Sequence, residues 1–224
     1  MKIIKPEVHV EGQDWKALIR KIEHKGRVCY KSEDRINDSS ADNFIKSLIQ
    51  RGHLSVLEHE KVSVKFTVDR GVSHEIVRHR IAAYSQESTR YCNYGNSDNG
   101  LTVIEPFFFP RPSLKFTGWR ECCEAIEQTY LGLLATGASP QEARSVLPNS
   151  LKTEIWVTYN LREWIHFFTL RAAKTAHPQM RQVVIPLLHT FEEFFPFLIG
   201  QIPWDRSFPL EHYAEVKVIE EGQV

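Results

Sequence analysis

The stretch from Lys61 to Val68 alternates strictly between polar and apolar residues. Its apolar residues, which a strand would place on one side, are Val62, Val64, Phe66 and Val68. Because successive side chains of a strand point to opposite faces, this pattern predicts a strand with one buried face and one face in water. A sheet that buries one face needs a covering layer, so the rest of the chain is expected to supply it.

Segments of helical periodicity are frequent enough to provide that layer. We predict helices over Asp14–Tyr30, from Ser40 to the exit glycine Gly52, over Ser113–Leu134, from Ser139, over Leu161–Leu170 and over Pro178–Leu198. Pro186 is expected to kink or split the last of these. Further strands are predicted over Lys2–Val10, Leu101–Glu105 and Ser150–Tyr159. The expected fold class is α+β, with a sheet flanked by helices in a single domain over residues 1–224.

The bulk composition excludes several classes of protein. The 28 basic and 28 acidic residues balance, which argues against a protein that binds nucleic acid through a broad basic field. No apolar run approaches the roughly 20 residues needed to cross a bilayer. The four cysteines lack C-x-x-C spacing. Reduced thiols in a cytoplasmic protein are the simplest interpretation.

The segment Arg78–Tyr91 carries the most chemistry in the chain. It reads R-H-R-I-A-A-Y-S-Q-E-S-T-R-Y and concentrates Arg78, Arg80 and Arg90 within a chain that is otherwise balanced. Guanidinium groups grip planar oxyanions through paired hydrogen bonds, so several together predict a phosphate or carboxylate ligand. The alternative interpretation is a solvated charged face. We expect this segment to begin as a short helix after Gly71 and to become extended near Ser88. The Asn93–Gly100 stretch that follows predicts a mobile surface loop.

Three common motifs fail on inspection. His74 and His79 are five residues apart, whereas a zinc-protease helix needs histidines four apart, so no metal is expected. No G-x-G-x-x-G is present, which excludes a Rossmann dinucleotide site by this test. Leu101 stands where a P-loop requires lysine. A bound nucleotide must therefore be held by side chains.

Arg-His-Arg, seven residues and then Ser88 resembles the signature of the flavin-dependent thymidylate synthases (the ThyX family). Three more segments are similar to the pattern of that family, in the same order along the chain. They are H-L-S-V-L-E-H from His53, A-R-S-V-L-P from Ala143 and N-L-R-E-W-I-H-F-F-T-L-R from Asn160. Each segment alone is weak evidence, but four in order are specific. The resemblance covers about residues 50–175.

The resemblance implies a role for each matching position. The expected flavin contacts are Ser55, Arg78, His79, Arg80, Gln86, Asn160, Leu161, Arg162 and His166. The expected contacts to deoxyuridine monophosphate (dUMP) are Glu75, Arg78, Gln86, Glu87, Ser88, Thr89, Arg90, Arg144 and Arg171. Among them, Arg171 is the expected catalytic residue. A guanidinium stays protonated, so it would act by stabilising the uracil N3 anion rather than as a base.

The residues themselves agree with parts of this assignment. Asn160 and Arg162 lie at a predicted helix N-terminus, where free N–H groups favour phosphate. Arg162 and His166 are four apart and share one helix face. Two positions depart from many relatives: Glu75 replaces glutamine, and Gln86 occupies the expected place of an acid while Glu87 precedes Ser88. The sequence leaves open which of Gln86 and Glu87 faces the nucleotide.

The implied reaction moves one carbon from 5,10-methylenetetrahydrofolate to C5 of dUMP, with FAD reduced by NADPH as the source of hydride. FAD is required because no side chain donates hydride. A homotetramer with flavin at subunit junctions is implied as well, without nucleic acid, membrane or metal. One rival is a nucleic-acid-binding module that uses Tyr84, Tyr91 and Tyr94 beside the arginines. The other rival is a metal-dependent nucleotide hydrolase.

Overall fold

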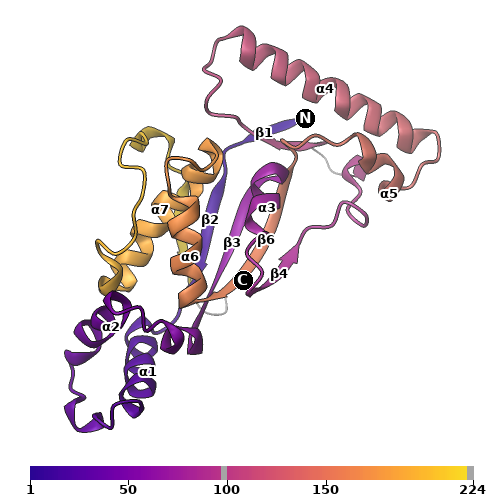
Figure 1. The fold of residues 1–224 in the computed structure, drawn as a ribbon. Coiled ribbons are helices and arrows are strands. Elements are labelled where there is room, and N and C mark those ends of the chain that lie inside the picture. The colour runs from indigo at the N-terminus through magenta and orange to yellow at the C-terminus, as the bar shows by residue number, and fades with distance from the viewer. Residues whose placement is uncertain (97–99, 221–224) are drawn as a thin grey trace. The chain divides into compact units, whose positions relative to one another are not determined.

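The computed structural model describes residues 1–96 and 100–220, and it divides into two compact units (Figure 1). Unit 1 comprises Met1–Glu7, Phe66–Arg78 and Tyr84–Trp156. Unit 2 comprises Val8–Lys65, His79–Ala83 and the chain from Val157 onward. Residues 97–99 of the predicted mobile loop lie outside the described residues. Just before them, Tyr94–Asn96 forms a 3-10 turn.

The main sheet has the strand order β4-β6-β3-β2-β7. The strands are β2 (Glu7–Glu11), β3 (Lys61–Asp69), β4 (Ala82–Gln86), β6 (Lys152–Asn160) and β7 (Glu215–Ile219). Within unit 1, β1 (Lys2–Ile4) pairs in parallel with β5 (Thr102–Ile104), and Lys2 is opposite Thr102. The α+β prediction is confirmed.

The strand predicted from the alternation over Lys61–Val68 is present as β3. In β3, Val62, Val64 and Phe66 are buried, while Ser63 and Lys65 between them are half-buried. The prediction is wrong for Thr67, which was expected in water but is only 4% exposed. From Thr67 to Asp69 every residue is buried, so the strand ends inside packed structure on both faces.

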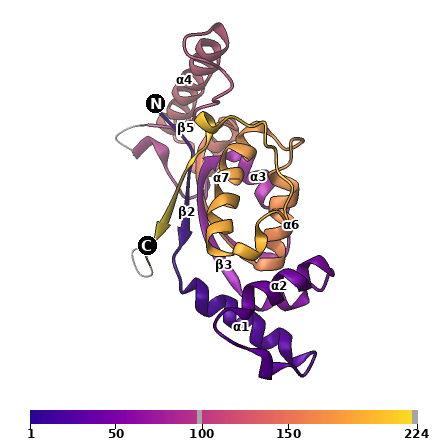
Figure 2. The same ribbon diagram turned by 90° about the vertical axis from the view of Figure 1, so that its left-hand side faces the viewer.

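Two helix pairs build unit 2. The first is α1 (Trp15–Val28) with α2 (Ser40–Gln50), and the second is α6 (Leu161–Arg171) with α7 (Pro178–Phe194). Figure 2 shows α6 and α7 side by side. Ring packing fills the space between them: Trp164 lies 5.5 Å from Phe168 and 4.9 Å from Phe191 between centroids. Each such side chain stabilises the fold by about 1.5–3 kcal/mol on burial.

A glycine ends α2 and sets the path of the next segment. Gly52 has a φ of +73°, its N–H donates to the Ile49 carbonyl at 2.9 Å, and the His53 N–H donates to the Leu48 carbonyl at 2.9 Å. These two bonds form a Schellman motif, which requires the left-handed conformation that glycine adopts without strain. The predicted exit glycine is confirmed. At the other end the helix begins at Ser40, as predicted, and Ser39 is the cap position.

Pro186 was expected to kink or split the last predicted helix, and it does not split α7. Pro186 has no N–H, which leaves the Gln182 carbonyl four residues earlier without its usual helical partner. The Ala214 N–H donates to that carbonyl at 2.9 Å instead. A segment of the C-terminal tail therefore replaces the missing hydrogen bond, and α7 runs unbroken from Pro178 to Phe194.

Unit 1 has its own helices and a small core. They are α3 (Arg70–Ile76), α4 (Leu114–Ala135) and α5 (Pro140–Ala143). Ser113 caps α4 by accepting from the Phe116 N–H at 3.1 Å. The predicted start of the next helix is confirmed, because the Ser139 N–H donates to the Glu142 carboxylate at 2.8 Å. The buried core here consists of Leu101, Tyr130, Ala143 and Leu151.

Three predicted boundaries are wrong for physical reasons. The opening strand over Lys2–Val10 is interrupted at Lys5 and Pro6, since proline cannot donate to a sheet. The helix before the arginine segment ends at Ile76, and the extended part is β4, which ends before Ser88. The C-terminal tail, for which no strand was predicted, forms β7. No helix among the described residues is long and apolar enough to cross a membrane.

Candidate functional site

The three residues of the Arg-His-Arg segment face different surroundings. They follow the end of α3 and precede β4. Arg78 and Arg80 are exposed, whereas His79 is only 4% exposed. The two guanidinium groups are thus accessible to a ligand from solvent, and the imidazole between them belongs to the interior of unit 2.

His79 forms a bridge between two residues of α6. Its Nδ1 lies 2.9 Å from Glu163 Oε1, and the Arg171 Nε–H donates to its Nε2 at 3.2 Å. An arginine N–H can only donate, so Nε2 must carry the lone pair and the proton must be on Nδ1. Nδ1–H then donates to the Glu163 carboxylate. The contacts define a neutral imidazole of one tautomer.

The electrostatic surroundings favour the same neutral state. Burial lowers the pKa of His79 below the usual histidine value, and the positive charge of Arg171 acts in the same direction. The hydrogen bond and negative charge of Glu163 oppose this shift, but burial is the larger effect. Desolvation penalises the imidazolium, and a neighbouring guanidinium repels it.

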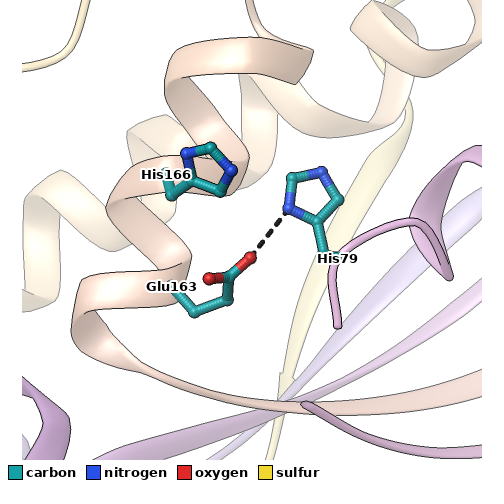
Figure 3. Close-up of side chains that lie close together, drawn as sticks. All are labelled: His79, Glu163 and His166. Carbon is teal, nitrogen blue, oxygen red and sulfur yellow. Dashed lines mark hydrogen bonds and ion pairs between the residues drawn. The ribbon is translucent and has the colours of Figure 1, made fainter. Parts of the chain in front are cut away.

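Figure 3 shows His166 beside this pair, on the same helix as Glu163. Donor atoms of His79, Glu163 and His166 lie within 4.8 Å of one another, a spacing that could hold a metal ion. The sequence search, which considered His74 with His79, missed this group. However, the hydrogen bonds engage both ring nitrogens of His79, and Arg171 adds a positive charge beside it. The chemistry of the donor set fits a hydrogen-bonded group better than a cation site.

Two cavities in unit 2 are lined by residues predicted to contact flavin. One of about 450 Å³ is lined by Ser55 and Arg162 together with apolar residues such as Leu48 and Val56. The other, of about 540 Å³, is lined by Asn160, Arg162, Glu163 and His166 among others. Arg162 lies on the walls of both. The sharing of a face by Arg162 and His166, predicted from their spacing, is therefore confirmed.

The N-terminus of α6 differs from the simple expectation of free N–H groups. Asn160 is the N-cap, and its Oδ1 accepts from the Glu163 N–H at 2.8 Å. The Leu161 N–H donates to the Glu60 carbonyl at 3.1 Å, and the Leu161 side chain is buried. Two of the first N–H groups therefore already have partners within the protein. At this end Arg162 is the group that extends into both cavities.

Arg162 already holds a carboxylate. Its Nη1 donates to Glu58 Oε1 at 2.5 Å, and about half of each side chain is exposed. Glu58 lies in the 3-10 turn η2 (Ser55–His59), which the α2 exit glycine directs toward α6. An oxyanion that binds Arg162 has to share or replace this carboxylate.

In unit 1, one carboxylate anchors the segment expected to hold nucleotide. Glu87 accepts from the Tyr94 hydroxyl and from Lys152 Nζ, both at 2.9 Å, and from the Glu154 N–H at 3.3 Å. Burial and the Glu87 charge raise the pKa of Tyr94, which keeps its phenol protonated as the donor. Three contacts within unit 1 thus occupy Glu87, which makes it an anchor for the turn that follows.

That turn carries Ser88, Thr89 and Arg90. The Cys92 N–H donates to the Ser88 carbonyl at 2.9 Å, which closes the turn. Arg144, in the 3-10 turn η4 (Arg144–Val146), lies 3.4 Å from the Thr89 hydroxyl. Two predicted nucleotide segments that are far apart in sequence are therefore neighbours in unit 1, with Arg90 and Arg144 both exposed.

The remaining predicted residues are held more firmly. The Gln86 amide donates to the hydroxyls of Ser73 and Thr153 at 2.9 and 3.2 Å. Glu75 is half-buried near the end of α3. The Gln86 amide nitrogen is directed into unit 1, and so is the Glu87 carboxylate, so neither group has the exposure of Arg90.

The tyrosines of the nucleic-acid-binding rival are mostly fixed by internal bonds. The Tyr84 hydroxyl donates to the Ile76 carbonyl at 2.9 Å, and the Tyr94 hydroxyl is bound to Glu87. Tyr91, at 79% exposure, is the member of the group that presents its ring to solvent. Stacking of successive bases needs several accessible rings, so this arrangement disfavours the rival.

Two functional candidates were missed by sequence reasoning. Glu163 lies inside the Asn160–Arg171 segment and directly follows Arg162, but the resemblance gives it no role of its own. Glu58 was quoted within its segment without a role of its own. A signal for Glu163 did exist: it precedes His166 by three residues, a spacing that places both on one helix face.

Comparisons with known proteins agree with this geometry. The family model "Thymidylate synthase complementing protein" matches residues 14–197. The flavin-dependent thymidylate synthase of Mycobacterium sp. (strain JLS) is 32% identical over 213 residues, covering 87% of this chain and 83% of the relative. That of Geobacter sulfurreducens is 32% identical over 177 residues, covering 76% and 75%. The crystal structure of the UMP/dUMP methylase PolB from Streptomyces cacaoi bound with 5-Br dUMP has a TM-score of 0.71 at 20% identity, covering 90% and 96%. This last likeness shows a shared fold.

Proposed function

This chain belongs to the thymidylate synthase complementing protein family, and from that membership we propose that it is a flavin-dependent thymidylate synthase that methylates dUMP to dTMP. One observation carries the proposal: the match over residues 14–197 includes every residue from Ser55 to Arg171 that the motifs nominated. Enzyme function depends on the site rather than on the fold alone. Most of the side chains nominated for flavin lie in unit 2 and most of those nominated for the nucleotide lie in unit 1, whereas Arg171 lies in unit 2.

We propose FAD as the cofactor, and the residues that line the two unit 2 cavities fit it. Arg162 offers a guanidinium for a pyrophosphate, and Ser55, Asn160 and His166 offer hydrogen-bonding groups. Apolar walls such as Leu48 and Val56 suit a flat ring system. A bound flavin supplies the hydride that converts a one-carbon unit into a methyl group.

We propose that unit 1 binds the nucleotide through Ser88, Arg90 and Arg144. The two arginines are exposed and lie at the turn that Glu87 anchors, so they are available to a 5′-phosphate. Ser88 would position the nucleotide, because no base is hydrogen-bonded to its hydroxyl among the described contacts that would make it a nucleophile. Arg171 would stabilise negative charge at uracil N3, which enriches electrons at C5.

The remaining participants follow from the family and are proposals too. They are 5,10-methylenetetrahydrofolate as carbon donor, NADPH as reductant of the flavin, a homotetrameric assembly and a cytoplasmic location. The test is to purify the protein, add FAD and assay dTMP formation from dUMP, 5,10-methylenetetrahydrofolate and NADPH. We expect bound flavin that is released on denaturation, and dTMP that depends on all three small molecules. A protein that fails to bind added FAD and forms no dTMP would refute the proposal.

A further inference from the structure

We propose that Glu163 and His79 are positioning residues, which hold the guanidinium of Arg171 in one orientation through a hydrogen-bonded chain. The inference deepens the proposed function, because it rests on Arg171 acting on the uracil ring. It also gives His79 a different task from the flavin contact that its motif implies. The chain reads Glu163 carboxylate, His79 Nδ1–H, His79 Nε2 and Arg171 Nε–H, with distances of 2.9 and 3.2 Å.

Burial holds this hydrogen-bonded series of side chains in a single arrangement. His79 is 4% exposed and Glu163 is 7% exposed, so neither can exchange its partner for water without cost. The Tyr159 and Phe167 rings lie about the imidazole at centroid distances of 6.1 and 5.0 Å and limit its rotation. Glu163 is itself fixed at the capped first turn of α6. The imidazole is thus held both in tautomer and in angle.

The consequence for Arg171 is geometric. It is the last residue of α6, where a side chain has more freedom than in mid-helix. A guanidinium is planar, so fixing Nε fixes the directions of both terminal nitrogens. Catalysis by a charge that develops on a ring depends on donors aimed in advance, and small misplacements are costly. His79 and Glu163 supply that aim without touching the substrate.

The hydrogen bond from Arg171 to His79 Nε2 forms only while the imidazole is neutral. An imidazolium would present an N–H toward the Arg171 N–H and place two positive charges side by side. Among the described residues, the charged or titratable groups that face the imidazole are Glu163, His166 and Arg171 from α6 and Tyr159 from β6. Burial and Arg171 lower the pKa of His79, whereas Glu163 raises it. Removing the negative charge of Glu163 should therefore shift loss of activity to lower pH.

The test compares Glu163→Ala, Glu163→Gln, His79→Ala and His79→Gln with the wild type, each with its FAD content measured. We expect Glu163→Ala and His79→Ala to lower kcat by about 100-fold, with a much smaller change in the KM for dUMP. Glu163→Gln should keep more activity and lose its activity at a lower pH than wild type. His79→Gln can place an uncharged oxygen near the Nε2 position, so it should rescue part of kcat and remove that acid-side loss.

The matched control is Glu192→Ala. Glu192 also accepts from a histidine Nδ1, that of His189 at 3.2 Å, but on α7 and outside the proposed site. It should leave kcat unchanged. A readout independent of turnover is the ¹⁵N chemical shifts of the His79 ring, which report the tautomer. The inference fails if wild type makes dTMP while both alanine variants retain its kcat, or if the ring carries its proton on Nε2. Absence of dTMP in the wild type would instead count against the proposed function.

Discussion

Arg144 and Arg171 are two guanidinium groups with different surroundings, which predicts different kinetic defects. Arg144 is exposed and near the Thr89 hydroxyl, where a phosphate would be bound equally before and during the reaction. Its loss should weaken nucleotide binding by about 1.5–3 kcal/mol, the usual range for a hydrogen bond to a charged group. Arg171 is half-buried and aimed by His79, so its loss should reduce kcat at saturating dUMP.

Lysine variants separate the two roles further. Phosphate accepts a point charge, so Arg144→Lys should recover most of the lost affinity. Arg171→Lys should recover little, because an ammonium lacks the planar donor pair. Steady-state kinetics of the alanine and lysine variants of both arginines, with FAD content checked in each, distinguish the binding role from the catalytic role. If Arg171→Ala turned over normally at saturating dUMP, its catalytic assignment would be wrong.

The buried imidazole of His79 also predicts how stability depends on pH. The pKa of His79 is lower in the folded protein than the value of about 6.5 in an unfolded chain. Between these two values the unfolded state binds more protons than the folded state, so stability rises with pH. We expect the stabilisation from the neutral His79 imidazole to be fully present above about pH 6.5. The free energy of unfolding should then fall as the pH drops from about 6.5 toward the folded pKa. Urea unfolding at several pH values should show a shallower dependence for His79→Gln; identical curves would contradict the assignment.

Helix α6 connects stability with ligand binding through its N-cap residue, Asn160. Asn160 caps the helix at 2.8 Å and also lines the larger cavity beside Arg162. Asn160→Ala should cost about 1 kcal/mol of stability. Asn160→Asp keeps a good cap and should keep the melting temperature, but its negative charge should weaken FAD binding if phosphates lie at this end.

The control for the cap is Ser113→Ala in α4, which removes a similar bond to Phe116. It should reduce stability without changing the FAD dissociation constant. Thermal unfolding and fluorescence titration with FAD measure both quantities. Equal FAD affinity in Asn160→Asp and wild type would show that the FAD phosphates do not bind at the N-terminus of α6.

Among the helices and strands, those that the sequence predicted well share one property. Strand β3 and helices α1 and α2 have a period that the hydrophobic pattern itself records. Strand β7 was not predicted, although Val216 and Val218 alternate with Glu215 and Lys217, because it is a short edge strand with no fully buried residue. The unbroken α7 depends on Ala214, a residue 28 positions from Pro186, and no local rule includes such a partner.

The candidate site, too, was predicted only in part from the sequence. The sequence nominated Arg78 and Arg80 through the concentration of arginines in one segment, and Arg171 through the resemblance to a family. It did not indicate that His79 points inward while its neighbours point outward, nor that it meets Glu163, which is 84 residues away. Such pairings depend on how the backbone is packed. The sequence likewise did not indicate that Glu87 contacts Tyr94 and Lys152.

For the whole molecule, the proposed assembly predicts that chains share sites. We expect light scattering to give the mass of four chains with FAD bound. We also expect Arg144→Ala and Arg171→Ala chains, each impaired alone when dUMP is limiting, to regain activity at that dUMP concentration when produced together. Random mixing restores up to about a quarter of the sites if different chains contribute the two arginines to a site. A monomer that holds FAD and turns over normally would refute the assembly, and no regained activity would place both arginines of a site on one chain.

If Arg162 binds a flavin phosphate, as we propose, its pairing with Glu58 gives flavin binding the character of anion exchange. In the free protein a carboxylate already neutralises this guanidinium, so an arriving phosphate replaces one anion by another. Little net charge is then buried, and added salt, which screens both partners, should weaken binding only slightly. In Glu58→Gln the same phosphate would meet an uncompensated cation. We expect the FAD dissociation constant of that variant to rise more steeply with potassium chloride than in wild type, and parallel slopes would show that the two anions do not compete.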